Sequence, residues 1–226
     1  GTQSQQQALL NAARKGQLDV QVLDRNIERI LDLIMRTRTF RHEPVSNKPD
    51  LDAHAQISRK AATEGMVLLK NERDALPLAA GKKLAIFGNS AHDIIIGGTG
   101  SGDVHEAYSV VLPEGMEKAG YATDKALSQA YAEHIKAAKA RRPETNPFLA
   151  PPPLPELVPT AEQIGAAVAA NDVGVITIGR NSGEFIDRKA KDDFYLTEAE
   201  QTLIRNVSTA FHKAGKPVVV VLNIGG

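Results

Sequence analysis

The sequence predicts an α/β fold: a mainly parallel sheet with helices on both faces, an α/β sandwich. From residue 52 onward, short apolar runs alternate with stretches of helical pattern, and this alternation is typical of parallel strands connected by helices. The runs are continuous in Val, Ile and Leu, which indicates strands that are covered on both faces. The expected strands are MVLLK (66–70), KLAIFG (83–88), VGVITIG (173–179) and VVVVLN (218–223).

The expected helices lie between these strands, and two of them begin with a capping box. In this motif a threonine and a Glu or Gln three positions later satisfy each other's backbone N–H groups. The two pairs are Thr160 with Gln163 and Thr197 with Glu200. The helices are expected near residues 54–64, 107–119, 124–140, 160–170 and 197–214.

An N-terminal helix over residues 18–35 has an apolar stripe but no partner core in the chain before it. Asp19 is expected to cap this helix. Its apolar residues recur at spacings of three and four, which places them on one face: Val20, Leu23, Ile27, Ile30, Leu31 and Ile34. Residues 1–40 are therefore interpreted as the tail of another unit, residues 41–65 as a linker and a first helix, and residues 66–226 as the α/β domain. The sequence stops directly after a strand, so we interpret this domain as incomplete and the chain as a fragment.

A proline-rich stretch separates two of the expected sheet elements. Seven of the twelve prolines fall in residues 143–159, a density that excludes a helix or an interior strand. The stretch is therefore an extended excursion, and the sequence leaves open whether it is a mobile linker, a packed arm or an interface segment.

Composition excludes several classes of partner. Lys and Arg total 27 against 27 Asp and Glu, so no excess positive charge favours nucleic acid or an anionic membrane. The chain has no cysteine, which excludes disulfides and thiolate metal sites. No apolar stretch approaches the roughly 20 residues that span a bilayer. Neither a metal nor a cofactor is expected.

Two loops follow expected strands and carry unusual residues, at the edge of a parallel sheet where ligands usually bind. The first contains GGTGSGD (97–103), which has neither the spacing of a dinucleotide fingerprint nor the lysine of a P-loop. Its glycines fit tight turns or close approach of a ligand, to which Ser101 could offer one donor and one acceptor.

The second loop, after residue 179, contains Arg180, Glu184, Asp187 and Arg188. Glu184 is compatible with a general acid/base, although a solvated carboxylate is the simpler interpretation of the pattern. Asp187 and Arg188 are expected to form ion pairs that fix the loop. His92 and His105 flank the glycine-rich loop, and we expect them to have packing or surface roles because histidines show no metal-binding spacing.

Five stretches, in collinear order, resemble glycoside hydrolase family 3, closest to its β-glucosidase-type members. LLNAARKGQLDVQVLDRNIERIL resembles the closing helices of that family's catalytic barrel, and SRKAATEGMVLLKNERDALPL resembles its entry into the α/β sandwich. GGTGSGDVH and SGEFIDR resemble the two sandwich loops that reach the active site, and KPVVVVLNIGG the strand that follows. The resemblance implies that residues 1–40 are the last helices of a (β/α)₈ barrel.

The resemblance also implies roles for particular residues. Glu184 corresponds to the acid/base glutamate, and Ser101 to a serine that contacts the terminal sugar, with Gly100 and Gly102 beside it. Phe185 stands where the family often has glycine, and it could line the aglycone side. The nucleophilic aspartate is expected on the barrel, outside these 226 residues.

The function implied is that of a retaining, exo-acting β-glucosidase whose partners are a β-glucoside or β-linked oligosaccharide and the rest of the same enzyme. The alternatives are a β-xylosidase or another exo-glycosidase of the family, a non-catalytic carbohydrate-binding module, and a flavodoxin-like regulator. N-acetylglucosaminidase-type members are disfavoured because they usually place a histidine acid/base in the barrel. A bacterial periplasmic or secreted location is favoured over the cytoplasm, and homo-oligomerisation is left open.

Overall fold

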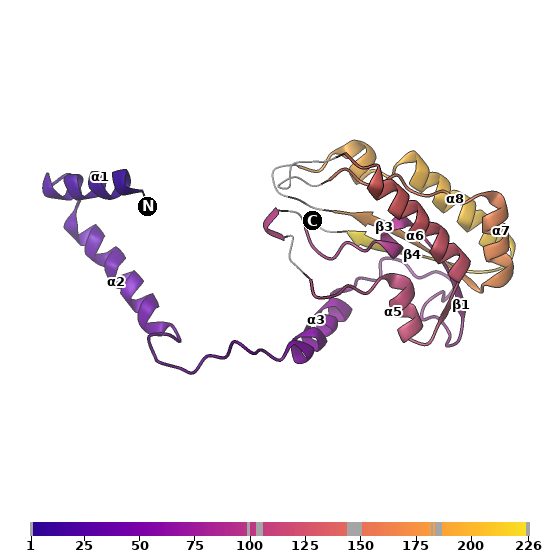
Figure 1. The fold of residues 1–226 in the computed structure, drawn as a ribbon, viewed down its shortest axis with the longest axis horizontal. Coiled ribbons are helices and arrows are strands. Elements are labelled where there is room, and N and C mark those ends of the chain that lie inside the picture. The colour runs from indigo at the N-terminus through magenta and orange to yellow at the C-terminus, as the bar shows by residue number, and fades with distance from the viewer. Residues whose placement is uncertain are drawn as a thin grey trace. The chain divides into compact units, whose positions relative to one another are not determined.

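The computed structural model describes residues 2–98, 100–102, 106–143, 151–181, 183 and 187–224. The chain divides into two compact units, residues 1–68 and 69–226, both drawn in Figure 1. The finer division of the sequence into a barrel tail, a linker and a sandwich domain stays a prediction.

The first unit contains three helices: α1 (Gln3–Arg14), α2 (Val20–Arg36) and α3 (Leu51–Gly65). Helix α2 confirms the helix expected over residues 18–35, and the carboxylate of Asp19 caps it by accepting a hydrogen bond from the Gln21 N–H at 2.9 Å. Its apolar stripe is exposed, with Ile30 59% accessible. Helix α1 was not singled out by an apolar pattern, although the family resemblance implied more than one helix within residues 1–40.

The second unit contains a fully parallel four-stranded sheet in the order β2-β1-β3-β4. Three expected strands are confirmed, and the short β2 joins β1 at the sheet's edge. The register pairs Phe87 with Ile176 and Arg180 with Ile224. The strands are β1 (Lys83–Phe87), β2 (Ala122–Thr123), β3 (Val173–Arg180) and β4 (Val218–Ile224).

The strand expected over residues 66–70 is wrong. This segment pairs with no strand in the described part of the chain, and Met66 and Leu69 are each 76% exposed. An apolar run shows only that a segment is suited to burial. A strand also needs a neighbouring backbone to complete its hydrogen bonds, and the local sequence does not contain that information.

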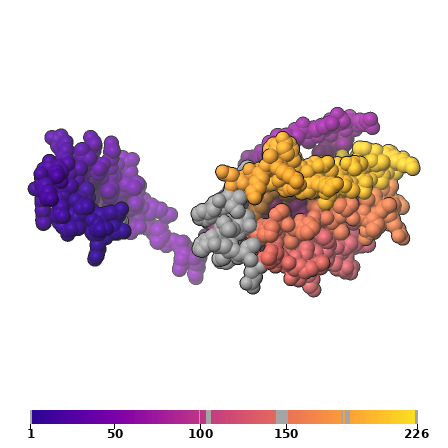
Figure 2. Space-filling model, turned by 90° about the horizontal axis from the view of Figure 1, so that it is seen from above, coloured from indigo at the N-terminus to yellow at the C-terminus, as the bar shows by residue number. Residues whose placement is uncertain are grey.

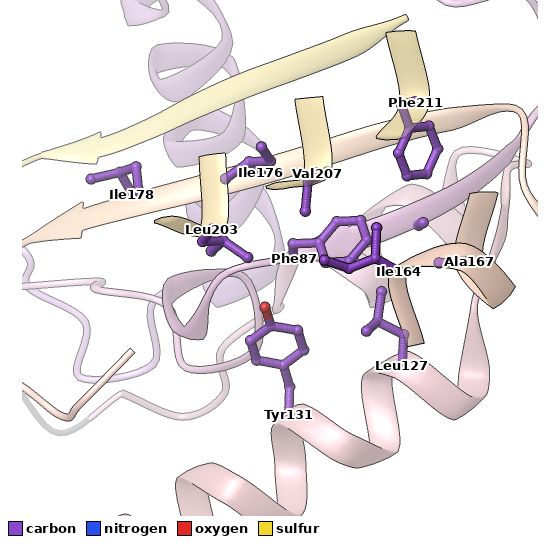
Figure 3. Close-up of a cluster of buried hydrophobic side chains, with 11 residues drawn as sticks. Phe87, Leu127, Tyr131, Ile164, Ala167, Ile176, Ile178, Leu203, Val207 and Phe211 are labelled. Atoms are coloured by element: carbon purple, nitrogen blue, oxygen red, sulfur yellow. The ribbon is translucent and has the colours of Figure 1, made fainter. Parts of the chain in front are cut away.

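Three helices cover one face of the sheet (Figure 1). Figure 3 shows their side chains converging on those of β1 and β3, with Tyr131, Leu203 and Phe211 completely buried. Phe87 and Phe211 meet edge to face with ring centroids 6.1 Å apart, a favourable aromatic geometry. In Figure 2 the salmon-coloured region that includes α6 lies beside the orange region that includes α7 and α8. The helices are α6 (Lys125–Ala140), α7 (Ala161–Ala170) and α8 (Glu198–Lys213).

The opposite face of the sheet is covered more sparsely, by α5 (Leu112–Lys118) and nearby side chains. Here Leu84, Ile86 and Val175 are buried, with Leu112 packed against them. The expected helix over residues 107–119 is thus shorter than predicted. Strand β4 is the open edge, and Leu222 is 47% exposed.

Both predicted capping boxes are present, and they fix where α7 and α8 begin. The Thr160 hydroxyl accepts from the Gln163 N–H at 3.2 Å, while the Gln163 side chain accepts from the Thr160 N–H at 2.8 Å. The Thr197 hydroxyl and the Glu200 carboxylate satisfy each other's N–H groups in the same way. These local hydrogen bonds were readable from the sequence because both partners lie within one turn.

Part of the proline-rich stretch is a packed arm. Pro159 is buried and Glu156, Leu157 and Val158 are partly buried, and Leu157 packs against the core beneath α6–α8. The buried hydroxyl of Tyr131 donates a long, 3.4 Å hydrogen bond to the Leu157 carbonyl. Residues 155–159 are therefore packed into the fold, whereas residues 151–153 are exposed. The packed-arm interpretation is thus correct for residues 155–159.

Gly88 allows β1 and β3 to approach closely where β1 ends. Its φ is +100°, a conformation that side chains rarely adopt, and an added Cβ would lie 2.3 Å from the Thr177 carbonyl oxygen. The Thr177 hydroxyl also donates to the Phe87 carbonyl at 3.1 Å. The turn out of β1 therefore needs glycine for two reasons: its backbone angle and its lack of a side chain.

Gly88→Ala should lower the free energy of unfolding of the domain by at least about 3 kcal/mol, because a strained φ and a backbone clash add together. Gly120→Ala is the matched control. Gly120 has a φ of +90° but open space around its Cβ position, so it should cost only the left-handed strain, about 1–2 kcal/mol. Denaturant unfolding of both variants measures the difference. Equal losses would show that the contact with Thr177 is unimportant.

Candidate functional site

The carboxyl ends of β1, β3 and β4 lie at one edge of the sheet because the strands are parallel and in register. Along the chain, β1 connects to β2 on one side and the chain then returns to β3 on the other. The strand order therefore reverses between β1 and β3, and ligands of open α/β sheets bind outside such a reversal. Both predicted loops leave from this edge.

The segment after β1 runs along this edge to β4. The Ile95 N–H donates to the Asn223 side chain at 2.9 Å, and the Asn223 amide donates back to the Ile95 carbonyl at 3.2 Å. The short helix α4 (Asn89–His92) lies between β1 and this contact, with the side chain of Ser90 close to Gly179. The described start of the first loop therefore passes the end of β3 and is hydrogen-bonded to the end of β4.

The glycine-rich loop that follows doubles back on itself. A Cβ on Gly97 would lie 2.8 Å from the Gly102 carbonyl oxygen, so no side chain fits there. Ser101 is exposed within a single 3₁₀ turn, η1 (Gly100–Gly102). The glycines thus have the turn-forming role that the sequence suggested, while the predicted contact of Ser101 with a sugar is not tested. Thr99 and residues 103–105, including His105, lie outside the described residues.

The second loop begins at Arg180, the last residue of β3, whose side chain is only 13% exposed. Its guanidinium donates to both carboxylate oxygens of Glu200, at 2.6 Å from Nη1 and 2.9 Å from Nη2. It also donates from Nε to the Asp193 carbonyl, from Nη1 to the Gly179 carbonyl at 2.7 Å, and from Nη2 to the Tyr195 carbonyl at 3.5 Å. One side chain thus joins a strand end, a helix start and the returning part of the loop.

Arg188 ties the same loop a second time. Its Nη1 donates to the Asp193 carboxylate at 2.6 Å, and its Nη2 donates to the Asn181 carbonyl at 3.1 Å. The Lys189 N–H also donates to the Asp193 carboxylate, at 2.8 Å. The expected structural ion pair of Arg188 is confirmed, and its partner is Asp193. Asp187 is exposed and forms no ion pair with any residue in the described part of the chain, so its expected role in fixing the loop is not seen there.

Glu184 and Phe185, the predicted acid/base and its neighbour, lie outside the described residues, as do Ser182 and Ile186. In sequence they fall between Asn181 and Arg188, which the hydrogen bond from Arg188 joins. Two described residues that flank Glu184 in the sequence are therefore joined to each other, and the predicted catalytic role of Glu184 stays a prediction.

Two carboxylates at this edge, the buried Glu200 and the partly buried Glu156, have opposite electrostatic environments. Burial acts to raise the pKa of Glu200, but the hydrogen bonds from Arg180 and Thr197 outweigh it and hold that pKa below its ordinary value. Glu156 has no such cation in contact. Burial raises the pKa of Glu156 to about 7, although the hydrogen bond from the Asn89 N–H acts to lower it.

Glu156 occupies the reversal point of the sheet. Its carboxylate accepts hydrogen bonds from the Asn89 N–H at 3.0 and 3.3 Å, directly after the turn out of β1. The charge of Glu200 in α8 acts to raise the pKa of Glu156, and the charge of Arg180 at the end of β3 acts to lower it. The Asn89 amide donates to the Pro155 carbonyl at 2.8 Å. The proline-rich arm thus fills the place where a flavodoxin-like protein of the same strand order would bind its ligand.

His92 is a packing residue, as expected. Its ring stacks on Tyr131 with centroids 4.7 Å apart and an interplanar angle of 9°, and its Nε2 lies 3.3 Å from the Ile86 carbonyl. Burial lowers the pKa of His92 despite this hydrogen bond. Within the described ranges, no group of three or more His, Asp or Glu side chains could hold a metal ion, and no helix there could cross a membrane.

Comparison with known proteins identifies the family. The profile of the glycosyl hydrolase family 3 C-terminal domain matches residues 66–226. The chain belongs to glycosyl hydrolase family 3. It is 35% identical over 199 residues to β-glucosidase A of Butyrivibrio fibrisolvens, which covers 76% of this chain and 23% of that protein.

A solved structure of this family extends the similarity to the fold. β-Glucosidase 3B from Thermotoga neapolitana, in complex with glucose, superposes on this chain with a TM-score of 0.89 at 40% sequence identity. The superposition covers 97% of this chain and 31% of the Thermotoga chain. An exo-α-(1→6)-L-arabinopyranosidase of Bifidobacterium breve is 32% identical over 106 residues, 42% of this chain and 14% of that protein. The chain thus spans a third or less of the length of these family 3 relatives, which is consistent with a fragment.

Sequence reasoning did not find the roles of Arg180, Glu200 and Glu156 at this edge. Glu200 was expected only as a cap, and its partner Arg180 stood out merely as a charge after an apolar run. A charged residue at the end of a buried strand is the one signal that could have marked Arg180. Glu156 gave no signal, because its hydrogen-bond partner Asn89 lies 67 positions away in the sequence.

Glu156 should make the stability of the domain depend on pH. Its pKa is about 7 when folded, against an ordinary value of 4.5, so the folded state binds more protons between these pH values and stability falls as pH rises through them. Glu156→Gln removes this dependence while keeping an acceptor for the Asn89 N–H. Relative to wild type, the variant's free energy of unfolding should therefore rise by up to about 3 kcal/mol between pH 4.5 and pH 8.

Denaturant unfolding at several pH values measures this effect, with Glu156→Ala as the matched variant. Alanine also removes the acceptor for Asn89, so Glu156→Ala should be less stable than Glu156→Gln at every pH, yet have the same pH profile. A glutamine variant whose profile parallels that of wild type would contradict a titrating Glu156.

Proposed function

We propose that this chain is part of a retaining, exo-acting β-glucosidase and that it supplies the acid/base, Glu184. The observation that carries the proposal is the position of SGEFIDR (182–188) in a family 3 C-terminal domain, directly after the strand end at Arg180. This edge of a parallel sheet is where α/β folds bind ligands. The β-glucosidases among the relatives support the choice of substrate.

A retaining glycosidase needs two carboxyl groups about 5–5.5 Å apart, one acting as nucleophile and one as acid/base. In our proposal a barrel domain outside these residues supplies the nucleophile. Glu184 protonates the glycosidic oxygen as the aglycone leaves and the covalent glucosyl-enzyme forms. The same residue then takes a proton from the water that attacks this intermediate, which returns Glu184 to its starting state.

The remaining predicted site residues receive supporting roles. Ser101, between Gly100 and Gly102, hydrogen-bonds the terminal sugar, because it is exposed on the loop that leaves the same sheet edge. Phe185 lines the aglycone side. A bacterial periplasmic or secreted location is part of the proposal.

A second candidate is an exo-glycosidase of the same family with a different terminal sugar, such as a β-xylosidase. The relative named as an arabinopyranosidase favours keeping this candidate. Rates with 4-nitrophenyl β-glucoside and β-xyloside distinguish the two. A flavodoxin-like regulator is disfavoured, since Glu156 occupies the ligand position of that fold.

In the full-length protein, Glu184→Ala should slow cleavage most for substrates with poor leaving groups, which need protonation. With phenyl β-glucoside, kcat/KM should fall by about 10²–10⁴-fold, the usual contribution of general acid–base catalysis. With 2,4-dinitrophenyl β-glucoside the first step should suffer less and deglycosylation should become limiting. Steady-state kinetics with both substrates measure this difference.

Azide provides the control that separates chemistry from misfolding. An anionic nucleophile needs no base, so azide should accelerate Glu184→Ala with the activated substrate and yield β-glucosyl azide. Glu184→Gln should behave similarly. Equal losses on both substrates without azide rescue would make Glu184 a structural residue. No activity on any glycoside in the wild-type protein would favour a non-catalytic carbohydrate-binding module.

A further inference from the structure

The connection between β3 and α8 is long and spans residues 181–197. Its described residues contain one short, kinked π-helical turn, η2 (Ala190–Phe194). Connections of this length with so little regular structure are uncommon unless they are functional. On its described returning limb, Phe194 and Tyr195 are 69% and 63% exposed. Hydrophobic burial of these side chains therefore does not fix the limb.

Backbone hydrogen bonds to arginine hold this limb instead. Arg180 donates to the carbonyls of Asp193 and Tyr195, and Arg188 binds the Asp193 carboxylate and the Asn181 carbonyl. Asp193 is thus held through its carbonyl by one arginine and through its side chain by the other. These hydrogen bonds, here called the ring, join residues that precede Glu184 in the sequence to residues that follow it.

The ring is anchored to the rigid part of the domain through Glu200. This residue is 8% exposed, and its carboxylate is shared between Arg180 and the N–H of Thr197 at the start of α8. Helix α8 is packed on the sheet through Leu203, Val207 and Phe211. The returning limb is therefore held in a fixed position relative to both the end of β3 and the first turn of α8.

We propose that Arg180 is a positioning residue for the acid/base reaction, holding the limbs of the Glu184 loop in fixed register through Asp193, Tyr195 and Glu200. This inference rests on the proposed role of Glu184. A stability role alone accounts for the arrangement less well, because a buried ion pair can often be replaced by apolar residues without loss of stability. The left-handed Asp192 (φ +57°) also indicates a limb whose conformation is imposed by its surroundings.

The consequence concerns geometry at the reacting oxygen. A displacement of about 1 Å in a catalytic group can cost about 10²-fold in rate. Loss of the Arg180 contacts leaves Glu184 present but poorly placed, so protonation of the leaving group is what suffers. Binding of the sugar by the rest of the site should change little.

The decisive variant is the double substitution Arg180→Met and Glu200→Met in the full-length protein. It removes both charges together, so neither is left buried without a partner, and methionine approximates the volume of each side chain. The variant should stay folded. Its kcat/KM, which reports the bond-breaking step, should fall by about 10²-fold for phenyl β-glucoside and by less than tenfold for 2,4-dinitrophenyl β-glucoside. Its KM for phenyl β-glucoside should change less than threefold.

Lys216→Met is the matched control. Lys216 is also a partly buried cation that donates to two carbonyls, those of Val168 and Asn171, the latter at 2.6 Å, but it precedes β4 at the opposite edge of the sheet. Its loss should lower the thermal stability without changing the ratio of the two kcat/KM values. A comparable change in this ratio in Lys216→Met would overturn the positioning role.

Adding Glu184→Ala to the double variant tests whether Arg180 acts through Glu184. If it does, the combined variant should be no more than about threefold slower on phenyl β-glucoside than Glu184→Ala alone, because residues that act as a unit are not additive. Full multiplication of the two effects, or wild-type kinetics in the folded double variant, would overturn the inference. Failure of Glu184→Ala itself to show the leaving-group difference would instead overturn the proposed function.

Discussion

The ion pair between Arg180 and Glu200 is the interaction on which this end of the domain depends. It joins the last residue of β3 to the first turn of α8, and from the same guanidinium it reaches the returning limb of the loop between them. Taking two charges out of water is costly, and such a pair is tolerated only when further hydrogen bonds satisfy the remaining donors and acceptors. Here the carbonyls of Gly179, Asp193 and Tyr195 and the N–H of Thr197 do so.

The same sheet edge gives two glutamates opposite properties. Glu200 keeps its charge because Arg180 contacts it, whereas the partly buried Glu156 has only backbone N–H groups as hydrogen-bond donors and holds its proton up to about neutral pH. Contact with a cation therefore decides which carboxylate stays ionised. Glu156 also holds the proline-rich arm at the reversal point of the sheet, because its carboxylate accepts a hydrogen bond from the Asn89 N–H.

Much of the fold could be predicted from the sequence, because the relevant interactions are local. The periodic apolar stripe of α2, the continuous apolar runs of β1, β3 and β4, and both capping boxes depend on residues within one or two turns of each other. The family resemblance also followed from short collinear motifs. The same local rules failed for residues 66–70, whose apolar run has no neighbouring strand in the described chain.

The candidate site was only partly predictable. The sequence by itself determined the α/β class, three of the four strands, most of the helices, the family and the two loops that follow β1 and β3. Only the tertiary structure decided that residues 155–159 are a packed arm, that Glu156 reaches Asn89, and that Arg180 rather than Asp187 anchors the second loop. The physical reason is that these contacts join backbone and side-chain groups from separate elements. Their energies depend on burial and on partners that come together only when α8 is packed on the sheet that contains β1 and β3.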